Sequence, residues 1–126
     1  MKERLLAVRG AISCRENTEE EILSATRELL LALVEANNIR PEDVVTAIFT
    51  VTPDLTAAFP ARAAREIGWT DQALLCAQEI AVPGAKERIV RVLIQFYGEP
   101  RPVRPVYLRE ARELRPDWTA SEDWRR

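Results

Sequence analysis

Two apolar runs decide how this chain folds: ALLCAQEI at residues 73–80 and RIVRVLI at residues 88–94. Each has the length and composition of a buried strand, yet the first contains Glu79 and the second contains Arg91. A charge inside such a run is costly to bury unless it has a partner. Arginine in particular offers a planar set of donors that suits oxygen atoms. The two residues are therefore either a structural ion pair or part of a site for an anion.

The sequence around these runs predicts further strands and two helices. Residues 5–12 and 44–52 are predicted as strands, and the first run should extend from Ala73 to Val82. Thr18 and Glu21 form a capping box for a helix that should end near Asn37. Pro60 fits the first position of a short helix at residues 60–67. Strands that alternate with two helices indicate a mixed α/β or α+β fold.

Composition indicates a single globular domain over residues 1–126, with a flexible tail from about residue 117. Apolar residues make up 47% of the chain and charged residues 30%, as in ordinary soluble domains. A net charge of −2 argues against a nucleic-acid partner. No apolar run reaches the roughly 18 residues needed to span a membrane. With two cysteines, no CxxC spacing and no signal peptide, the cytoplasm is the expected location.

The chain has no histidine, which limits the chemistry it can perform. Histidine is the commonest general base, a common metal ligand and the usual partner of a serine or cysteine nucleophile. Two cysteines alone are too few for the common zinc sites, and no glycine-rich phosphate loop is present. We therefore expect no metal and no cofactor, and any catalysis should need little proton transfer.

Three other arginines stand out beside Arg91. Arg9 is the only charge in residues 5–12 and precedes Gly10, which would let a backbone or a ligand approach closely. Arg62 and Arg65 are three residues apart on the predicted short helix, so they share a face and could hold an anion. The alternative is that all three are solvated surface residues.

Taken together, these segments resemble a known family, the monofunctional chorismate mutases of the small trimeric mixed α/β class. The matching segments occur in family order and at family spacing over nearly the whole chain: VRGA (8–11), TEEEI (18–22), TPDL (52–55), FPARAAR (59–65), CAQE (76–79), IVRV (89–92), VYL (106–108) and LRPD (114–117). Each segment alone is weak, but the set is specific. The resemblance implies an α+β fold, a mixed sheet with helices packed on one side, in a homotrimer whose sheets form a pseudo-barrel.

The same resemblance implies an activity and a set of site residues. The activity is the conversion of chorismate to prephenate in phenylalanine and tyrosine synthesis, in clefts between subunits and without a cofactor. Arg91 would bind the ether oxygen and a nearby carboxylate, and Glu79 would accept from the ring hydroxyl. The remaining residues implied to bind substrate are Arg9, Phe59, Ala61, Arg62, Arg65, Leu75, Cys76, Tyr107, Leu114 and Arg115. Because Cys76 and Glu79 are three apart, an ideal strand would direct them to opposite faces, so either the strand is irregular there or Cys76 contributes its backbone.

Two other functions are compatible with the residues. One is an imine or enamine hydrolase of similar trimeric shape, which would also use an arginine to hold a carboxylate but must activate water. The other is a non-catalytic carboxylate-binding module whose arginines only hold an anion.

Overall fold

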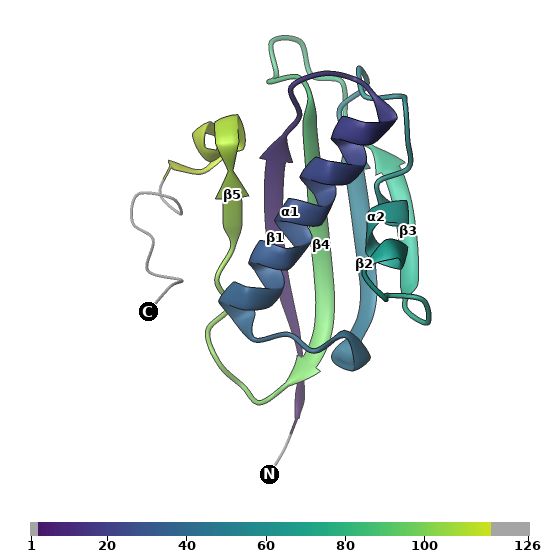
Figure 1. The fold of residues 1–126 in the computed structure, drawn as a ribbon. Coiled ribbons are helices and arrows are strands. Elements are labelled where there is room, and N and C mark those ends of the chain that lie inside the picture. Colours follow the sequence, from purple (N-terminus) through teal and green to yellow (C-terminus); the bar gives the residue numbers. More distant parts are fainter. Residues whose placement is uncertain (1–2, 117–126) are drawn as a thin grey trace.

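The computed structural model describes residues 3–116, and a five-stranded mixed sheet lies at its centre (Figure 1). The strand order is β3-β2-β4-β1-β5. The central strand β4 runs antiparallel to β1 and β2, whereas the outer strands β3 and β5 run parallel to β2 and β1. The strands are β1 (Arg4–Ser13), β2 (Val44–Val51), β3 (Ala73–Gln78), β4 (Ile89–Gly98) and β5 (Val106–Leu108).

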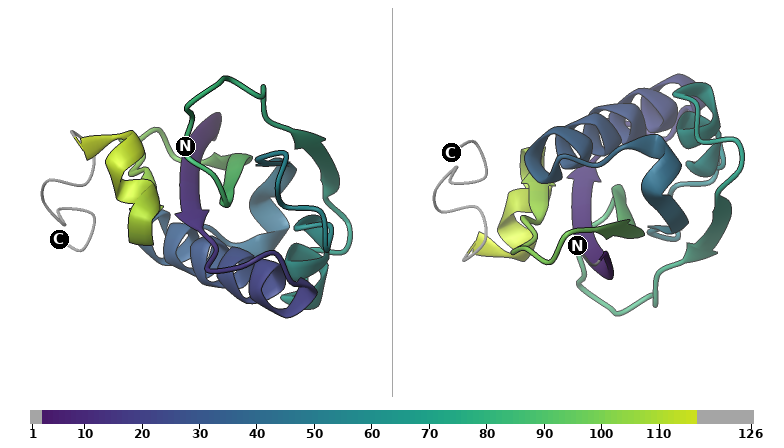
Figure 2. Two further views of the ribbon diagram at one scale, coloured as in Figure 1. Left: turned by 90° about the horizontal axis from the view of Figure 1, so that it is seen from above. Right: turned by 90° about the horizontal axis from the view of Figure 1, so that it is seen from below.

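Both α-helices pack on the same side of this sheet (Figure 2). Helix α1 (Glu19–Asn37) connects β1 to β2, and the short helix α2 (Ala61–Glu66) connects β2 to β3. Two 3-10 turns, η1 (Pro41–Asp43) and η2 (Arg109–Leu114), complete the described elements. The predicted α+β fold, a mixed sheet with helices packed on one side, is therefore confirmed.

Strand β4 shows how the sheet separates its two faces. Its side chains at Val90, Val92, Ile94 and Phe96 are buried beneath the helices, while those at residues 91, 93, 95 and 97 face the other way and are less buried. This is the period of two expected of a strand that is covered on one side only. We call the two sides the helix-covered face and the open face. Within residues 3–116, no α-helix packs on the open face; the 3-10 turn η2 covers one part of it, where Ala111 packs against Ala11 and Ile89.

Helix α1 begins and ends much as its sequence predicts. The Thr18 hydroxyl accepts a hydrogen bond from the backbone N–H of Glu21 at 3.2 Å, and Asn38 ends the helix in a left-handed conformation with φ of 51°. Only the Thr18 half of the predicted capping box is present. The carboxylate of Glu21 accepts from the backbone N–H of Arg15 at 2.7 Å, so it fixes the loop that enters the helix instead of closing on Thr18.

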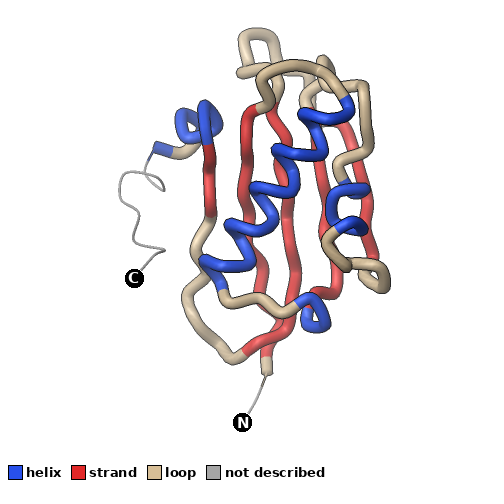
Figure 3. The backbone as a smooth tube through the Cα atoms, in the orientation of Figure 1, coloured by secondary structure: helices blue, strands red, loops and turns tan. Residues whose placement is uncertain are grey.

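The predicted end of β3 at Val82 is wrong, because the strand ends at Gln78. Its neighbour β2 ends at Val51, so there is no further strand for β3 to pair with. One last backbone hydrogen bond joins Glu79 N–H to the carbonyl of Val51 at 2.8 Å. Glu79 is thus the first residue of the long loop that leads to β4, drawn in tan in Figure 3.

Strand β5 lies beside β1 because Gly10 has no side chain. A Cβ atom at this position would lie 2.7 Å from the carbonyl oxygen of Val106 and 2.9 Å from a methyl group of Leu33. The proline-containing segment before β5 is held by Asn37, whose buried amide bonds to the backbone N–H and carbonyl of Arg104 at 2.7 and 3.0 Å. A run that the sequence showed only as a short apolar segment is therefore the fifth strand.

Two further expectations concern a membrane-spanning helix and the C-terminal tail. No helix in residues 3–116 is long and apolar enough to cross a membrane. The flexible tail predicted from about residue 117 lies outside the described residues.

Candidate active site

A pocket of about 370 Å³ opens on the open face of the sheet. We call it the open-face pocket. Four side chains singled out from the sequence meet here, although they come from different parts of the chain: Arg9, Glu79, Arg91 and Tyr107. The other lining residues are Gly10, Ile48, Thr50, Val92 and Leu93.

Glu79 and Arg91 form a loose ion pair in this pocket. Arg91 Nε lies 3.5 Å from Glu79 Oε2, and both side chains are partly exposed. The same carboxylate oxygen accepts a 2.5 Å hydrogen bond from the Thr50 hydroxyl. Arg91 Nε is itself buried and has no hydrogen-bond partner among the described residues. Such a donor is costly to leave unsatisfied, so its orientation is informative.

The register of the sheet places these three side chains together. Arg91 on β4 is paired with Thr50 on β2 in the antiparallel ladder, so both project to the same face. Glu79 follows β3 immediately and remains tied to Val51, the neighbour of Thr50. The carboxylate of Glu79, the hydroxyl of Thr50 and the guanidinium of Arg91 therefore meet because β3, β2 and β4 are neighbours in the sheet.

Residues of the TPDL segment fix the start of β4. The Thr52 hydroxyl accepts from the backbone N–H of Ile89 at 3.1 Å, and Asp54 accepts from that of Arg88 at 3.0 Å. Arg88 has a left-handed φ of 57°, and its Nε donates to the carbonyl of Cys14 at 3.1 Å. These contacts give TPDL a structural task, which is to hold the turn that sets the position of Arg91 three residues later.

Tyr107 reaches the pocket from β5 and is only 5% exposed. Behind it, Arg109 donates to the Ser13 carbonyl at 3.0 Å, to Glu21 at 2.9 Å and to Glu28 at 2.8 Å. Burial disfavours the charge of Arg109, but its bonds to Glu28 and Glu21 outweigh burial and raise its pKa above the ordinary value. The ion pairs tie the end of β5 to α1 and so fix the tyrosine.

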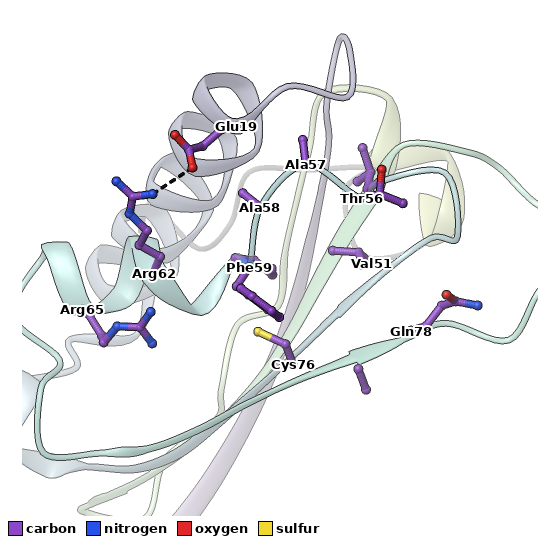
Figure 4. A pocket seen from close by; sticks show the side chains of 13 residues that line it. Glu19, Val51, Thr56, Ala57, Ala58, Phe59, Arg62, Arg65, Cys76 and Gln78 are labelled. Carbon is purple, nitrogen blue, oxygen red and sulfur yellow. Dashed lines mark hydrogen bonds and ion pairs between the residues drawn. The ribbon is translucent and has the colours of Figure 1, made fainter.

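A second pocket, of about 560 Å³, lies beside α2 on the helix-covered side of β3 (Figure 4). We call it the helix-side pocket. Arg62 and Arg65 line it from α2, and Arg62 points toward Glu19, with which it is paired at 2.9 Å; it is also paired with Glu66 at 3.3 Å. Arg65 makes no ion pair with any of residues 3–116. The pocket is lined by Glu19, Val51, Leu55, Thr56, Ala57, Ala58, Phe59, Pro60, Arg62, Arg65, Cys76, Ala77 and Gln78.

The structure thus divides the predicted site residues into two groups. Arg9, Glu79, Arg91 and Tyr107 line the open-face pocket, and Phe59, Arg62, Arg65 and Cys76 line the helix-side pocket. Cys76 packs against the core while Glu79 lies on the open face, as in an ideal strand, so within one subunit the two do not line the same pocket. Four predicted residues line neither of these two pockets: Ala61, Leu75, Leu114 and Arg115.

The residues outside the two pockets have different environments. Ala61 is buried in the core and Leu75 is 59% exposed on the open face. Leu114 packs against the small cluster that contains Tyr107. The sequence reasoning missed Thr50, because a threonine in a β-branched run reads as an ordinary strand residue. Alternation along the strand places Thr50 on the face opposite Phe49, but nothing in the sequence indicates that its hydroxyl has a role.

The open-face pocket can bind an anion and stabilise separated charge. It holds two guanidinium groups, one carboxylate and one phenol, which are fixed charges and hydrogen-bonding groups. Such an arrangement suits a reaction in which negative charge grows on one oxygen and positive charge on a nearby carbon framework.

Comparison with known proteins gives a consistent result. The family model for chorismate mutase type I matches residues 5–118. Chorismate mutase AroH of Thermus thermophilus is 52% identical over 118 residues, 91% of this chain and 97% of that protein. Chorismate mutase AroH of Bacillus subtilis strain 168 is 40% identical, over 92% and 94% of the two chains. A solved chorismate mutase from Clostridium thermocellum has a TM-score of 0.84 and 43% identity, and the match covers 86% of this chain and 98% of that one.

Proposed function

The chain belongs to the chorismate mutase type I family, and from this premise we propose how this isomerase of aromatic amino-acid biosynthesis acts on chorismate. The reaction is an intramolecular Claisen rearrangement to prephenate, in which one C–O bond breaks and one C–C bond forms. No atom enters or leaves, and no proton is transferred. An enzyme can accelerate it by holding the compact reactive conformer and by stabilising the charge that separates as the C–O bond breaks.

Arg91 is the group that stabilises the ether oxygen. The observation that supports this role is its buried Nε, which lacks a hydrogen-bond partner within residues 3–116 and lies in a pocket with a second arginine. A buried donor gains most when negative charge develops beside it, because the low local dielectric strengthens the attraction. Its charge is permanent, so no proton has to be supplied.

Glu79 complements this charge on the other side of the substrate. As a carboxylate it accepts from the ring hydroxyl and opposes positive charge that develops on the ring. Arg9 binds the side-chain carboxylate, and Tyr107 donates to it through its hydroxyl. All four side chains line one pocket, so a small dicarboxylate can contact them together.

A complete site requires a second subunit, and we propose a homotrimer. The open face exposes large apolar side chains that water would normally not meet: Leu5, Val45, Leu75 and Tyr97 are 40–59% exposed. Because Cys76 lines the helix-side pocket and Glu79 lines the open-face pocket, one subunit cannot bring both to one substrate, and the helix-side pocket of one subunit would face the open-face pocket of its neighbour. Phe59, Arg62, Arg65, Cys76 and the remaining predicted residues would then enclose the substrate.

Direct assay tests the reaction class. Purified protein is mixed with chorismate, the loss of ultraviolet absorbance is followed, and the product is acidified and tested for phenylpyruvate. Both signals are expected, whereas an imine hydrolase or a simple carboxylate binder would give neither.

We also expect kcat to change little between about pH 6 and 9, because no proton transfer is needed. A steep bell-shaped profile would contradict the pericyclic mechanism.

Sedimentation and a chelator test the remaining parts of the proposal. A trimer is expected by equilibrium sedimentation, and an active monomer would contradict a shared site. Activity should be unchanged by EDTA, since the proposed mechanism uses no metal or cofactor. A single domain over residues 1–126 and a cytoplasmic location also remain predictions.

A further inference from the structure

One hydrogen bond in the open-face pocket is not explained by the roles given to Arg91 and Glu79. The hydroxyl of Thr50 donates to Glu79 Oε2 at 2.5 Å, and the same oxygen lies 3.5 Å from Arg91 Nε. Glu79 is therefore bonded to a neutral hydroxyl while a guanidinium stands just beyond hydrogen-bond distance.

This arrangement is opposite to what charge alone would favour. A carboxylate beside a guanidinium normally forms short, charge-assisted hydrogen bonds of about 2.7–2.9 Å. Here the Nε of Arg91 is buried, lies next to a carboxylate and has no hydrogen-bond partner in the described part of the chain. The short contact of that carboxylate oxygen is with the Thr50 hydroxyl, at 2.5 Å, and not with the guanidinium, at 3.5 Å.

The backbone makes this contact rigid. Thr50 is paired with Arg91 across the β2–β4 ladder, so the hydroxyl and the guanidinium start from fixed, adjacent positions. Glu79 is anchored one residue away, through its N–H to the Val51 carbonyl at 2.8 Å. The β-branched side chain of threonine has few rotamers in a strand, which keeps its hydroxyl in place.

We propose that Thr50 is a positioning residue of the reaction: its hydroxyl holds Glu79 Oε2, prevents the Glu79–Arg91 pair from closing, and leaves Arg91 Nε and Glu79 Oε1 for the substrate. The proposal rests on the roles given above to Arg91 and Glu79. Without the hydroxyl, the two charges would approach each other in the empty pocket. Chorismate would then have to separate them before it could bind.

The first test compares three variants by steady-state kinetics with chorismate. Thr50→Val removes the hydroxyl and keeps the shape, and we expect kcat/KM to fall about tenfold, mainly through a higher KM. Thr50→Ser retains the hydroxyl and should stay within about threefold of the parent. Thr46→Val is the matched control, because Thr46 is on the same strand, is also partly buried and does not line the pocket, so it should change little. If Thr50→Val does not fold, Thr50→Ala tests the same loss.

A merely structural role for Thr50 would give a different pattern. A poorly folded variant would lower the active fraction and therefore kcat, and serine would not rescue it through its hydroxyl. The decisive control repeats Thr50→Val in a Glu79→Gln background, where we expect less than a twofold further change because Thr50 acts through Glu79. An equal tenfold loss in both backgrounds, or no loss in the parent, would overturn the inference.

Arg91→Met separates this inference from the mechanism on which it rests. If Arg91→Met is severely impaired and Thr50→Val is not, the positioning role fails while the proposed mechanism stands. If Arg91→Met itself remains close to the parent, both fail together.

Discussion

The open-face and helix-side pockets lie on opposite faces of the sheet, and Arg91 in the first is held differently from Arg62 in the second. In the open-face pocket, Arg91 has a buried nitrogen without a hydrogen-bond partner in residues 3–116 and a carboxylate held 3.5 Å away. In the helix-side pocket, Arg62 is exposed and bonded to two carboxylates, at 2.9 and 3.3 Å. Arg91 thus has an unsatisfied donor in one pocket, whereas Arg62 is paired in the other.

This difference indicates where binding energy can be used for catalysis. An exposed ion pair is worth only about 0–1 kcal/mol, since water and salt screen it. A buried donor with no partner interacts far more strongly with charge that appears only in the transition state. We therefore expect substitution of Arg91 to lower kcat and substitution of the helix-side arginines to raise KM.

Arg91→Met should have the largest effect. It removes the charge with little change in size, and kcat should fall at least a hundredfold, about 2.7 kcal/mol of transition-state stabilisation. The fold should survive, because the side chain is partly exposed. Steady-state kinetics and thermal unfolding measure the two effects separately. A variant within tenfold of the parent would remove Arg91 from the mechanism.

Gly10→Ala should have the next largest effect, through the fold. The added Cβ would lie 2.7 Å from the Val106 carbonyl, so β5 and Tyr107 must shift. Overpacking of this kind costs about 1–3 kcal/mol, and we expect that loss in chemical denaturation together with a higher KM. Gly84→Ala is the matched control. It is strained by a φ of 83° but has open space around it, so it should lower stability without changing KM.

Arg65→Ala and Arg62→Ala should have smaller effects and differ from each other. Arg65 has no ion-pair partner in the described range 3–116, so its charge is free to attract a dianion, and its loss should raise KM about fivefold at low salt. Arg62 is already neutralised by Glu19 and Glu66, and its loss should raise KM about twofold. Kinetics at two ionic strengths measure both. Equal effects would show that the internal ion pairs do not matter for binding.

The two cysteines should differ clearly in their reactivity toward a thiol reagent, although we expect this difference to have the smallest effect on activity. Burial, reinforced by Glu21, raises the pKa of Cys14 to about 11, so very little of it is thiolate at pH 8.5. Cys76 is partly exposed in the helix-side pocket and should react first. Its labelling should slow when prephenate is bound. Mass spectrometry after proteolysis identifies the modified residue, and Cys14 reacting first would contradict the burial assigned to it.

Sequence patterns were sufficient to predict the elements whose side chains alternate clearly. The start and end of α1 follow from its capping residues, and the buried run of β4 follows from its apolar sequence, so both elements could be predicted. The end of β3 could not, because it depends on where its neighbour β2 stops and not on its own residues. Strand β5 was recognised only as an apolar segment, since its place depends on the missing side chain of Gly10.

The site was predictable in its charges but not in its geometry. Glu79 and Arg91 are conspicuous because they interrupt apolar runs, and the structure brings them into one pocket. The hydroxyl of Thr50 gives no such signal in the sequence. Neither do the ion pairs of Arg109 with Glu21 and Glu28, which fix Tyr107. Both are contacts between residues far apart in the chain, and only the fold reveals them.

The most direct test of the central claim is a crystal structure of the enzyme with prephenate, or a stable analogue of the transition state, bound. We predict that an oxygen of the ligand lies within hydrogen-bond distance of the Arg91 guanidinium and that its ring hydroxyl contacts Glu79, with Arg9 and Tyr107 on a carboxylate. A ligand bound away from both Arg91 and Glu79 would contradict the account.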